Sequence, residues 1–157
     1  MKIMFYISIG LTIFCILGVI YAYHIFNAKN WKNTDFANIQ IGSLNIRAEV
    51  AASPLKKSAG LSARSDLAQN SGMLFIFSRP SRYSFWMRGM RFPLDFIWIK
   101  DHVVVDVSKN IPFPKKMEFP DTVLPAEPAD MILEINAGLT DIFNIRTGDK
   151  VNIEKAQ

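Results

Sequence analysis

Two acidic residues stand where the pattern of the sequence calls for apolar side chains. Asp95 lies within the apolar run Leu94–Ile99, and strict alternation places its side chain on the same strand face as two isoleucines. Glu134 occupies a comparable position in the run Met131–Ile135, and Asn136 follows it on the same face. An unpaired carboxylate is costly to bury, so each side chain must have hydrogen-bonding partners or face a cleft.

Arginine side chains are the natural partners of these carboxylates. Arg64 and Arg88 are suited by type, because a guanidinium group can bind a carboxylate through two parallel hydrogen bonds. One interpretation is a structural network of ion pairs and hydrogen bonds that locks the core. The other is a site in which Asp95 and Glu134 act as the acid–base pair of a hydrolase, or form the floor of a binding pocket. Carboxyl groups roughly 5–10 Å apart across an open cleft would support the hydrolase.

An aromatic residue adjoins one of these arginines. Trp86 could line a ligand cleft, although such side chains more often belong to a hydrophobic core. The predicted cluster, which serves binding or structure, therefore has six members: Arg64, Trp86, Arg88, Asp95, Glu134 and Asn136.

The sequence offers no motif for a cofactor or a metal ion. A phosphate-binding loop, a dinucleotide fingerprint and a GxSxG nucleophile elbow are all absent. His24 falls at the end of the apolar N-terminal segment and His102 in an expected hairpin turn, so the two cannot share a metal. No stretch has the density of acidic residues that Ca²⁺ or Mg²⁺ requires. We therefore predict no cofactor and no metal site.

Short strands are the elements expected to position the candidate residues. Gly72–Ile99 contains three apolar runs separated by proline and glycine, each too short for a stable helix and typical of a buried strand. Period-two alternation on both sides of Gly42 predicts a hairpin with one wet face. The strands expected outside the central stretch are residues 39–41, 44–50, 103–107, 131–135 and 151–153.

Helices are expected to be few and short. Ser53-Pro54 is typical of a helix start, and Thr140 is expected to cap one helical turn. Five prolines between Pro112 and Pro128 predict a surface segment without regular strand pairing. The predicted fold class is α+β and mostly β: a compact barrel-like or sandwich domain of short antiparallel strands with one or two short helices.

The N-terminal segment differs from the rest of the chain. Ile3–Tyr23 contains no charged residue and is long enough to cross a hydrocarbon core of about 30 Å as a helix. We predict a single uncleaved transmembrane anchor, with a cleaved signal peptide as the alternative. The chain then divides into an anchor at residues 1–26, a polar tether at residues 27–38 and a β-rich domain at residues 39–157.

The charge of the domain excludes one class of partner. From Asp35 onward, 15 basic residues stand against 14 acidic ones, so the domain carries a net charge of +1. A nearly neutral domain has no electrostatic footprint for nucleic acid. The single cysteine, Cys15, lies in the apolar segment, which leaves the domain with no disulfide and no thiol nucleophile. The lysines that flank the segment leave its membrane orientation open.

A series of ordered motifs also carries a family resemblance, which extends from about Leu44 to Ile153. The motifs are Gly72-Met73-Leu74-Phe75, Phe85-Trp86-Met87-Arg88, Pro93-Leu94-Asp95, Val105 through Asn110 with Pro112, Leu133-Glu134 with Asn136-Ala137-Gly138, and Gly148-Asp149. Together they resemble the family catalogued as domain of unknown function 192, small bacterial and archaeal proteins often made with an N-terminal signal or anchor. Gly89-Met90 departs from the Asn-Thr found in many members. The resemblance implies a β-rich fold and an extracytoplasmic setting, and it implies no reaction.

These observations predict a membrane-anchored extracytoplasmic domain of the cell envelope. We expect a non-catalytic binding or accessory module, with the hydrolase based on Asp95 and Glu134 as the alternative. The expected partners are membrane lipid, through residues 3–23, and an unidentified envelope protein, peptide or glycan. No nucleic acid and no cofactor are expected.

Overall fold

A computed structural model describes residues 12–19, 31, 35–62, 64–115, 119–120 and 122–156. Seven strands form one sheet in the order β6-β5-β8-β3-β2-β1-β9, and two short strands, β4 and β7, form a separate ribbon. The strands are β1 (Phe36–Ile41), β2 (Leu44–Ala51), β3 (Ser71–Ser81), β4 (Phe85–Trp86), β5 (Leu94–Lys100), β6 (Val103–Ile111), β7 (Thr122–Val123), β8 (Ala129–Asn136) and β9 (Val151–Lys155). The two short helices of the domain are α2 (Pro54–Ala59) and α3 (Leu139–Ile142).

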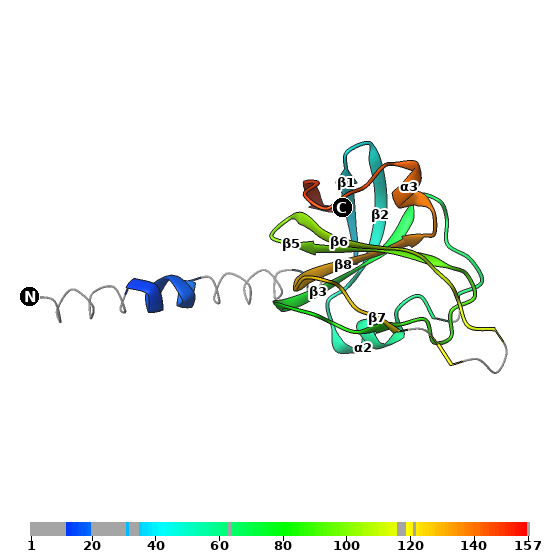
Figure 1. The fold of residues 1–157 in the computed structure, drawn as a ribbon, viewed down its shortest axis with the longest axis horizontal. Coiled ribbons are helices and arrows are strands. Elements are labelled where there is room, and N and C mark those ends of the chain that lie inside the picture. The colour runs from blue at the N-terminus through cyan, green and yellow to red at the C-terminus, as the bar shows by residue number, and fades with distance from the viewer. Residues whose placement is uncertain are drawn as a thin grey trace, which may run out of the picture.

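The large sheet curls into a half-barrel, as Figure 1 shows. Its two edge strands approach each other at one end, where Val103 at the start of β6 bridges Lys150 just before β9. Backbone hydrogen bonds reinforce this contact, with Val104 N donating to Asp149 O at 2.9 Å. The prediction of a mostly β fold is therefore confirmed.

One strand pair departs from the expected antiparallel pattern. β2 and β3 run parallel, with Arg47 opposite Ser71 and Ala51 opposite Phe75. A parallel pair needs a crossover connection, and α2 with the loop at residues 60–70 supplies it on the outer side of the sheet. The expectation of antiparallel strands was wrong at this pair, because the connection between Ala51 and Ser71 is long enough to return the chain to the same end of the sheet.

Apart from Asp95 on β5, the inner face of the half-barrel is apolar. Alternate residues of each strand point inward, as Ile39 and Ile41 do on β1 and Ile97 and Ile99 do on β5. Burial of these side chains supplies most of the driving force for folding, at roughly 25 cal/mol per Å² of apolar surface. The prediction of a hairpin with one solvent-exposed face is confirmed for β1 and β2.

A second apolar cluster lies on the outer face of β3, β5 and β8, where α2 and the β4–β7 ribbon cover the sheet. Phe85 of the ribbon is central to it, with ring-centroid distances of 4.9 Å to Phe75, 5.9 Å to Phe96 and 5.7 Å to Trp98. All three contacts are edge-on, the geometry that adds about 0.5–1.5 kcal/mol per pair beyond area burial. The part of the outer face that β3, β5 and β8 form is therefore covered.

The proline-rich segment takes part in this cover. β7 lies within Pro112–Pro128 and pairs with β4, so the expectation of no regular pairing was wrong. Arg82 Nε donates to the Pro125 carbonyl at 2.8 Å, which holds the segment against the ribbon. Proline is compatible with this ribbon because the pairing involves only residues between the prolines.

Only part of the predicted anchor falls within the described residues. Residues 12–19 form a helix with exposed side chains, and the remainder of the predicted span Ile3–Tyr23 lies outside the described residues. Within the described part of the chain, no helix has the length and apolar character to cross a bilayer. β1 begins at Phe36, so regular structure starts within residues 27–38 of the predicted tether.

Candidate functional site

The two carboxylates singled out in the sequence lie on opposite faces of the sheet. Asp95 is opposite Ile135 in the β5–β8 pairing, and Ile135 belongs to the inner cluster. Glu134 is opposite Phe96, which belongs to the outer cluster. The sheet itself separates the two groups, so they do not face each other across a cleft as a hydrolase pair would.

Asp95 is fully buried and accepts three hydrogen bonds. Its Oδ1 accepts from Asn110 N at 2.7 Å, and its Oδ2 accepts from Thr140 N at 3.0 Å and Thr140 Oγ1 at 2.7 Å. The prediction that an arginine pairs with Asp95 was wrong, because backbone amides and a hydroxyl group supply the hydrogen-bond donors instead. Thr140 was also misassigned: Gly138 is the residue at the N-cap of α3, and the Thr140 side chain turns to Asp95. Asp95 thereby ties β5 to the end of β6 and to α3.

Glu134 is buried under the covered part of the outer face. Its Cα partners are Met73 on β3 and Phe96 on β5, and its side chain makes no hydrogen bond or ion pair with other described residues. Burial raises the pKa of the Glu134 carboxyl to about 8. The group is therefore mostly a neutral acid at pH 7.

The expected partners of these carboxylates are engaged elsewhere. Arg64 binds Glu49 through two parallel hydrogen bonds, Nη1–Oε1 at 2.7 Å and Nη2–Oε2 at 2.8 Å. The hydrogen bonds and charge of Arg64 lower the pKa of Glu49. Arg88 lies with its guanidinium carbon 5.4 Å from the centre of the Trp86 ring. The assignment of Arg64 and Arg88 to Asp95 and Glu134 was wrong.

Asn136, the last member of the predicted cluster, holds the crossover loop. Its Nδ2 donates to Leu67 O at 2.9 Å and to Ala68 O at 3.2 Å. The six predicted residues thus occupy the inner core, the covered outer face, the β4–β7 ribbon and the crossover loop. They do not converge on one site.

A groove lies instead on the uncovered part of the outer face, across β2, β1 and β9. Three neighbouring concavities of about 320, 370 and 270 Å³ lie there: the first over β1 and β9, the second over β2, β1 and β9, and the third between β2 and the crossover loop. Glu49 and Arg64 line the third. The first and second share Gln40 and Asn152, and the second and third share Arg47. A strand of the length of β1 spans roughly 17–20 Å, so the groove is long enough for an extended ligand.

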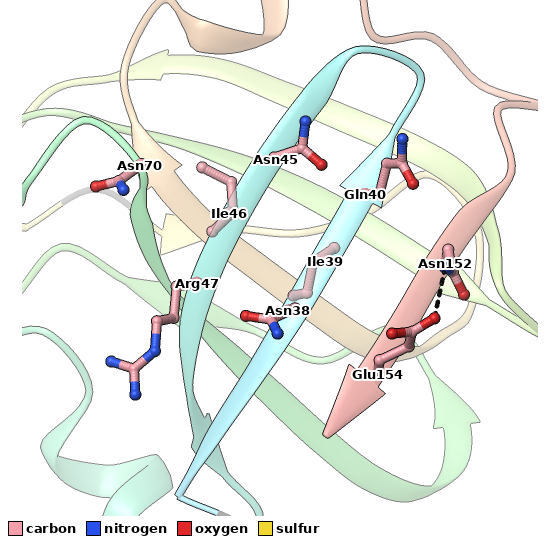
Figure 2. Close-up of a pocket in the computed structure, with 9 residues that line it drawn as sticks. All are labelled: Asn38, Ile39, Gln40, Asn45, Ile46, Arg47, Asn70, Asn152 and Glu154. Carbon is pink, nitrogen blue, oxygen red and sulfur yellow. Dashed lines mark hydrogen bonds between the residues drawn. The ribbon is translucent and has the colours of Figure 1, made fainter. Parts of the chain in front are cut away.

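The floor of this groove is a grid of polar side chains, drawn in Figure 2. The strand pairings place the side chains in two rows across β2, β1 and β9. One row is Asn45, Gln40 and Asn152, and the next is Arg47, Asn38 and Glu154. All six side chains are exposed.

The pleat of the hairpin determines this arrangement. Ile39 and Ile46 are almost fully buried on the inner face, so their neighbours in sequence must point outward. A slip of one residue would bury the amides and expose the isoleucines, which specifies the register strongly. The grid is therefore held rigidly by the core behind it.

Several polar groups in the groove remain available to a ligand. The side chains of Asn38, Asn70 and Arg47 make no hydrogen bond with other described residues. The Gln40 Nε2 donates only a long bond of 3.4 Å to Gly42 O, which leaves the amide oxygen as an acceptor. The Arg47 guanidinium carbon lies 3.9 Å from the centre of the Phe36 ring, a cation–π contact that holds the guanidinium beside the groove.

Comparison with known proteins places the fold in a family. The family model of DUF192, described as an uncharacterized ACR, matches residues 37–153. This chain belongs to the DUF192 family. The resemblance carried by the sequence motifs is thereby confirmed. A comparison with curated proteins gives no match.

Two solved structures share the fold of this DUF192 domain. A candidate transcription regulator from Sinorhizobium meliloti 1021 is 24% identical, with a TM-score of 0.67 over 76% of this chain and 94% of that one. A protein of unknown function from Novosphingobium aromaticivorans DSM 12444 is 32% identical, with a TM-score of 0.62 over 74% of this chain and 83% of that one. At 24% identity, the similarity to the Sinorhizobium meliloti protein shows a shared fold alone.

The described residues of the DUF192 domain contain no group of three His, Cys, Asp or Glu side chains that could hold a metal ion. The groove was missed in the sequence because its residues are ordinary polar residues of a hairpin. A signal was nevertheless present, since three of the solvent-facing residues of the hairpin, Asn38, Gln40 and Asn45, are amides, and Asn is depleted in strands. Neither the crossover loop that borders the groove nor the adjoining strand β9 could be placed from local patterns.

Proposed function

We propose that this protein is a membrane-anchored, extracytoplasmic binding module of the cell envelope and that its groove binds a glycan chain. The observation that carries the proposal is the set of neighbouring concavities over β2, β1 and β9, floored by the grid of polar side chains, four of them amides.

The chemistry of the grid matches that of sugar hydroxyl groups. Each hydroxyl both donates and accepts a hydrogen bond, and each Asn or Gln amide offers two donors and an acceptor. Glu154 adds acceptors and Arg47 adds donors at the two ends of one row. A grid that repeats along and across the strands is suited to a ligand whose hydroxyl groups also repeat.

Other ligand classes fit the groove less well. Peptides bind by pairing with a sheet edge, by filling apolar grooves or by packing against aromatic residues, and the groove floor is the polar face of paired strands. Phosphate-rich ligands need clustered positive charge, whereas here Arg47 and Glu154 balance each other across Asn38. A neutral or weakly charged glycan remains the best match.

The cellular setting is part of the proposal. The uncharged run Ile3–Tyr23 supports a membrane anchor, and the family resemblance supports an extracytoplasmic domain. Carbonate washing of isolated membranes tests the anchor. The chain should stay in the membrane pellet, and release of a shortened protein would show that the segment is a cleaved signal.

Binding is tested with the full chain in detergent on a panel of neutral oligosaccharides, including chito- and cello-oligosaccharides. At least one glycan should bind, and Asn38→Ala or Gln40→Ala should weaken that binding about fivefold or more, the effect of losing roughly one hydrogen bond. Gln69→Ala is the matched control, because Gln69 is an exposed amide beside the groove that does not line it. The proposal fails if no glycan binds, or if the groove variants bind as well as the control.

A further inference from the structure

A second exposed surface lies on the β4–β7 ribbon, away from the groove. Alternation along residues 82–88 turns Tyr83, Phe85 and Met87 toward the outer cluster. The same alternation turns Arg82, Ser84, Trp86 and Arg88 to the outside, and all four are exposed. An arginine–tryptophan–arginine face therefore covers the outside of the ribbon.

The partner strand extends this face with another apolar side chain. Thr122 of β7 lies opposite Trp86, and Leu124 follows on the same side of the strand. Trp86 is 60% exposed and Leu124 is 55% exposed, so two large apolar side chains lie side by side on this face. Arg82 is held beside Leu124 by its bond to the Pro125 carbonyl.

The two arginines are free to bind an anion. Neither Arg82 nor Arg88 forms an ion pair with a carboxylate of the described residues. The Arg88 guanidinium stays beside the Trp86 ring at 5.4 Å, so the positive charge and the apolar surface are presented together. Exposed aromatic side chains flanked by cations are typical of surfaces that lie in a lipid headgroup region.

We propose that this ribbon face, formed by Arg82, Trp86, Arg88 and Leu124, docks on the surface of a membrane that contains anionic phospholipids. The guanidinium groups bind lipid phosphates, and Trp86 and Leu124 enter the boundary between headgroups and acyl chains. Charge complementarity and the two exposed apolar side chains together favour lipid. A nucleic acid backbone would use the arginines and leave Leu124 without a role.

This inference is independent of the glycan groove, because the two surfaces lie over different strands. The groove lies over β2, β1 and β9, and the ribbon covers β3, β5 and β8. A chain that uses both would rest its covered side on lipid and leave its groove open to the envelope. Failure of one proposal leaves the other intact.

The test uses a fragment that begins at Trp31, so that the predicted anchor cannot cause binding. The matched region makes up 94% of the Sinorhizobium meliloti chain, so that structure forms the same fold with little besides it. Co-sedimentation is measured with vesicles of phosphatidylcholine alone and with vesicles that also contain phosphatidylglycerol. The fragment should bind the anionic vesicles more tightly, and added salt should weaken the binding.

Single substitutions then locate the surface. Arg82→Gln and Arg88→Gln should each weaken vesicle binding about fivefold, since each basic side chain near an anionic surface contributes about 1 kcal/mol. Trp86→Ser should weaken it as well, whereas Lys100→Gln, an equal change of charge at the exposed end of β5, should not. Equal binding to neutral vesicles, no effect of the arginine variants, or binding to duplex DNA without binding to vesicles would overturn the proposal.

Discussion

Glu49 and Glu134 lie in one row across the outer face of the sheet, each paired with Met73 on the strand between them. Their environments are opposite. Glu49 is partly exposed beside the groove, and Arg64 lowers its pKa. Glu134 is buried beneath the covered side, and loss of hydration raises its pKa to about 8.

The difference between these glutamates reflects a division of the outer face into two parts. Over β3, β8 and β5, loops and the ribbon exclude water and the strands carry aromatic and apolar side chains. Over β1, β9 and the first half of β2, no element of the described residues covers the strands, and their outer side chains are mainly polar. The uncovered part contributes to stability mainly through its inner face, so outer side chains such as Asn38 and Gln40 are available for binding.

The largest effect is expected inside the fold, at Asp95. Asp95→Asn retains one acceptor oxygen and places an amide group against donors from Asn110 and Thr140. We expect a loss of about 3–5 kcal/mol, because each unsatisfied buried donor costs about 1–3 kcal/mol. Thermal melts should show a much lower midpoint, while Asp66→Asn, the same change at an exposed site, should leave it unchanged. An unchanged midpoint for Asp95→Asn would refute the structural role.

The next effect is a pH dependence that arises from Glu134. Because the folded-state pKa of about 8 exceeds the ordinary glutamate pKa of 4.5, the folded state binds one more proton than the unfolded state between these pH values. The free energy of unfolding should therefore fall as pH rises through this window, by about 1.4 kcal/mol per pH unit from this group. Glu134→Gln removes this pH-dependent contribution to the free energy of unfolding. The variant should therefore gain stability relative to the wild type from pH 5 to pH 8. Denaturant unfolding at both pH values measures this, and a constant difference would contradict it.

A smaller effect of opposite sign is expected at the Arg64–Glu49 pair. Because the folded-state pKa of Glu49 is lowered, the pair stabilises the fold at pH values above the unfolded-state pKa of this glutamate. The stabilisation is lost as the pH falls through the folded-state pKa. Both side chains are more than one-third exposed, so the pair should contribute at most about 1 kcal/mol. A double-mutant cycle with Arg64→Met and Glu49→Gln measures the coupling. A coupling of several kcal/mol would mean that this region is buried in solution.

The smallest effect on stability is expected in the groove. Asn38→Ala and Gln40→Ala remove exposed side chains that support no other element, so the free energy of unfolding should stay within about 0.5 kcal/mol of the wild type. Thermal and denaturant melts check this directly. A large loss of stability would show that the grid has a structural role.

Much of the strand framework was predictable from local patterns. Alternation located the hairpin of β1 and β2, and the Ser53-Pro54 start located α2, whose N-cap accepts from Lys56 N at 3.3 Å. The segment containing β7 was misjudged because its prolines flank the paired residues rather than interrupt them. Such patterns are reliable because they depend on neighbours in the chain.

The candidate site was less predictable because it depends on distant partners. The face on which a carboxylate lies is decided by strand register, and a shift of one residue reverses it. Asp95 finds its donor in Thr140, 45 residues away, which no local pattern could reveal. The groove requires β9 to lie beside β1 and the crossover loop to end at Asn70, so its amides converge only in the folded chain.

The most direct test of the central claim is an NMR titration of the fragment that begins at Trp31 with the oligosaccharide that binds best. The largest amide shift changes should fall in β1, the first half of β2, β9 and at Asn70 and Ser71, and Asn38→Ala should diminish them. The covered side, reported by β5 and β8, should remain unchanged. Shift changes centred on the covered side or on the ribbon, or binding that persists undiminished in Asn38→Ala, would contradict the assignment of the groove as the ligand site.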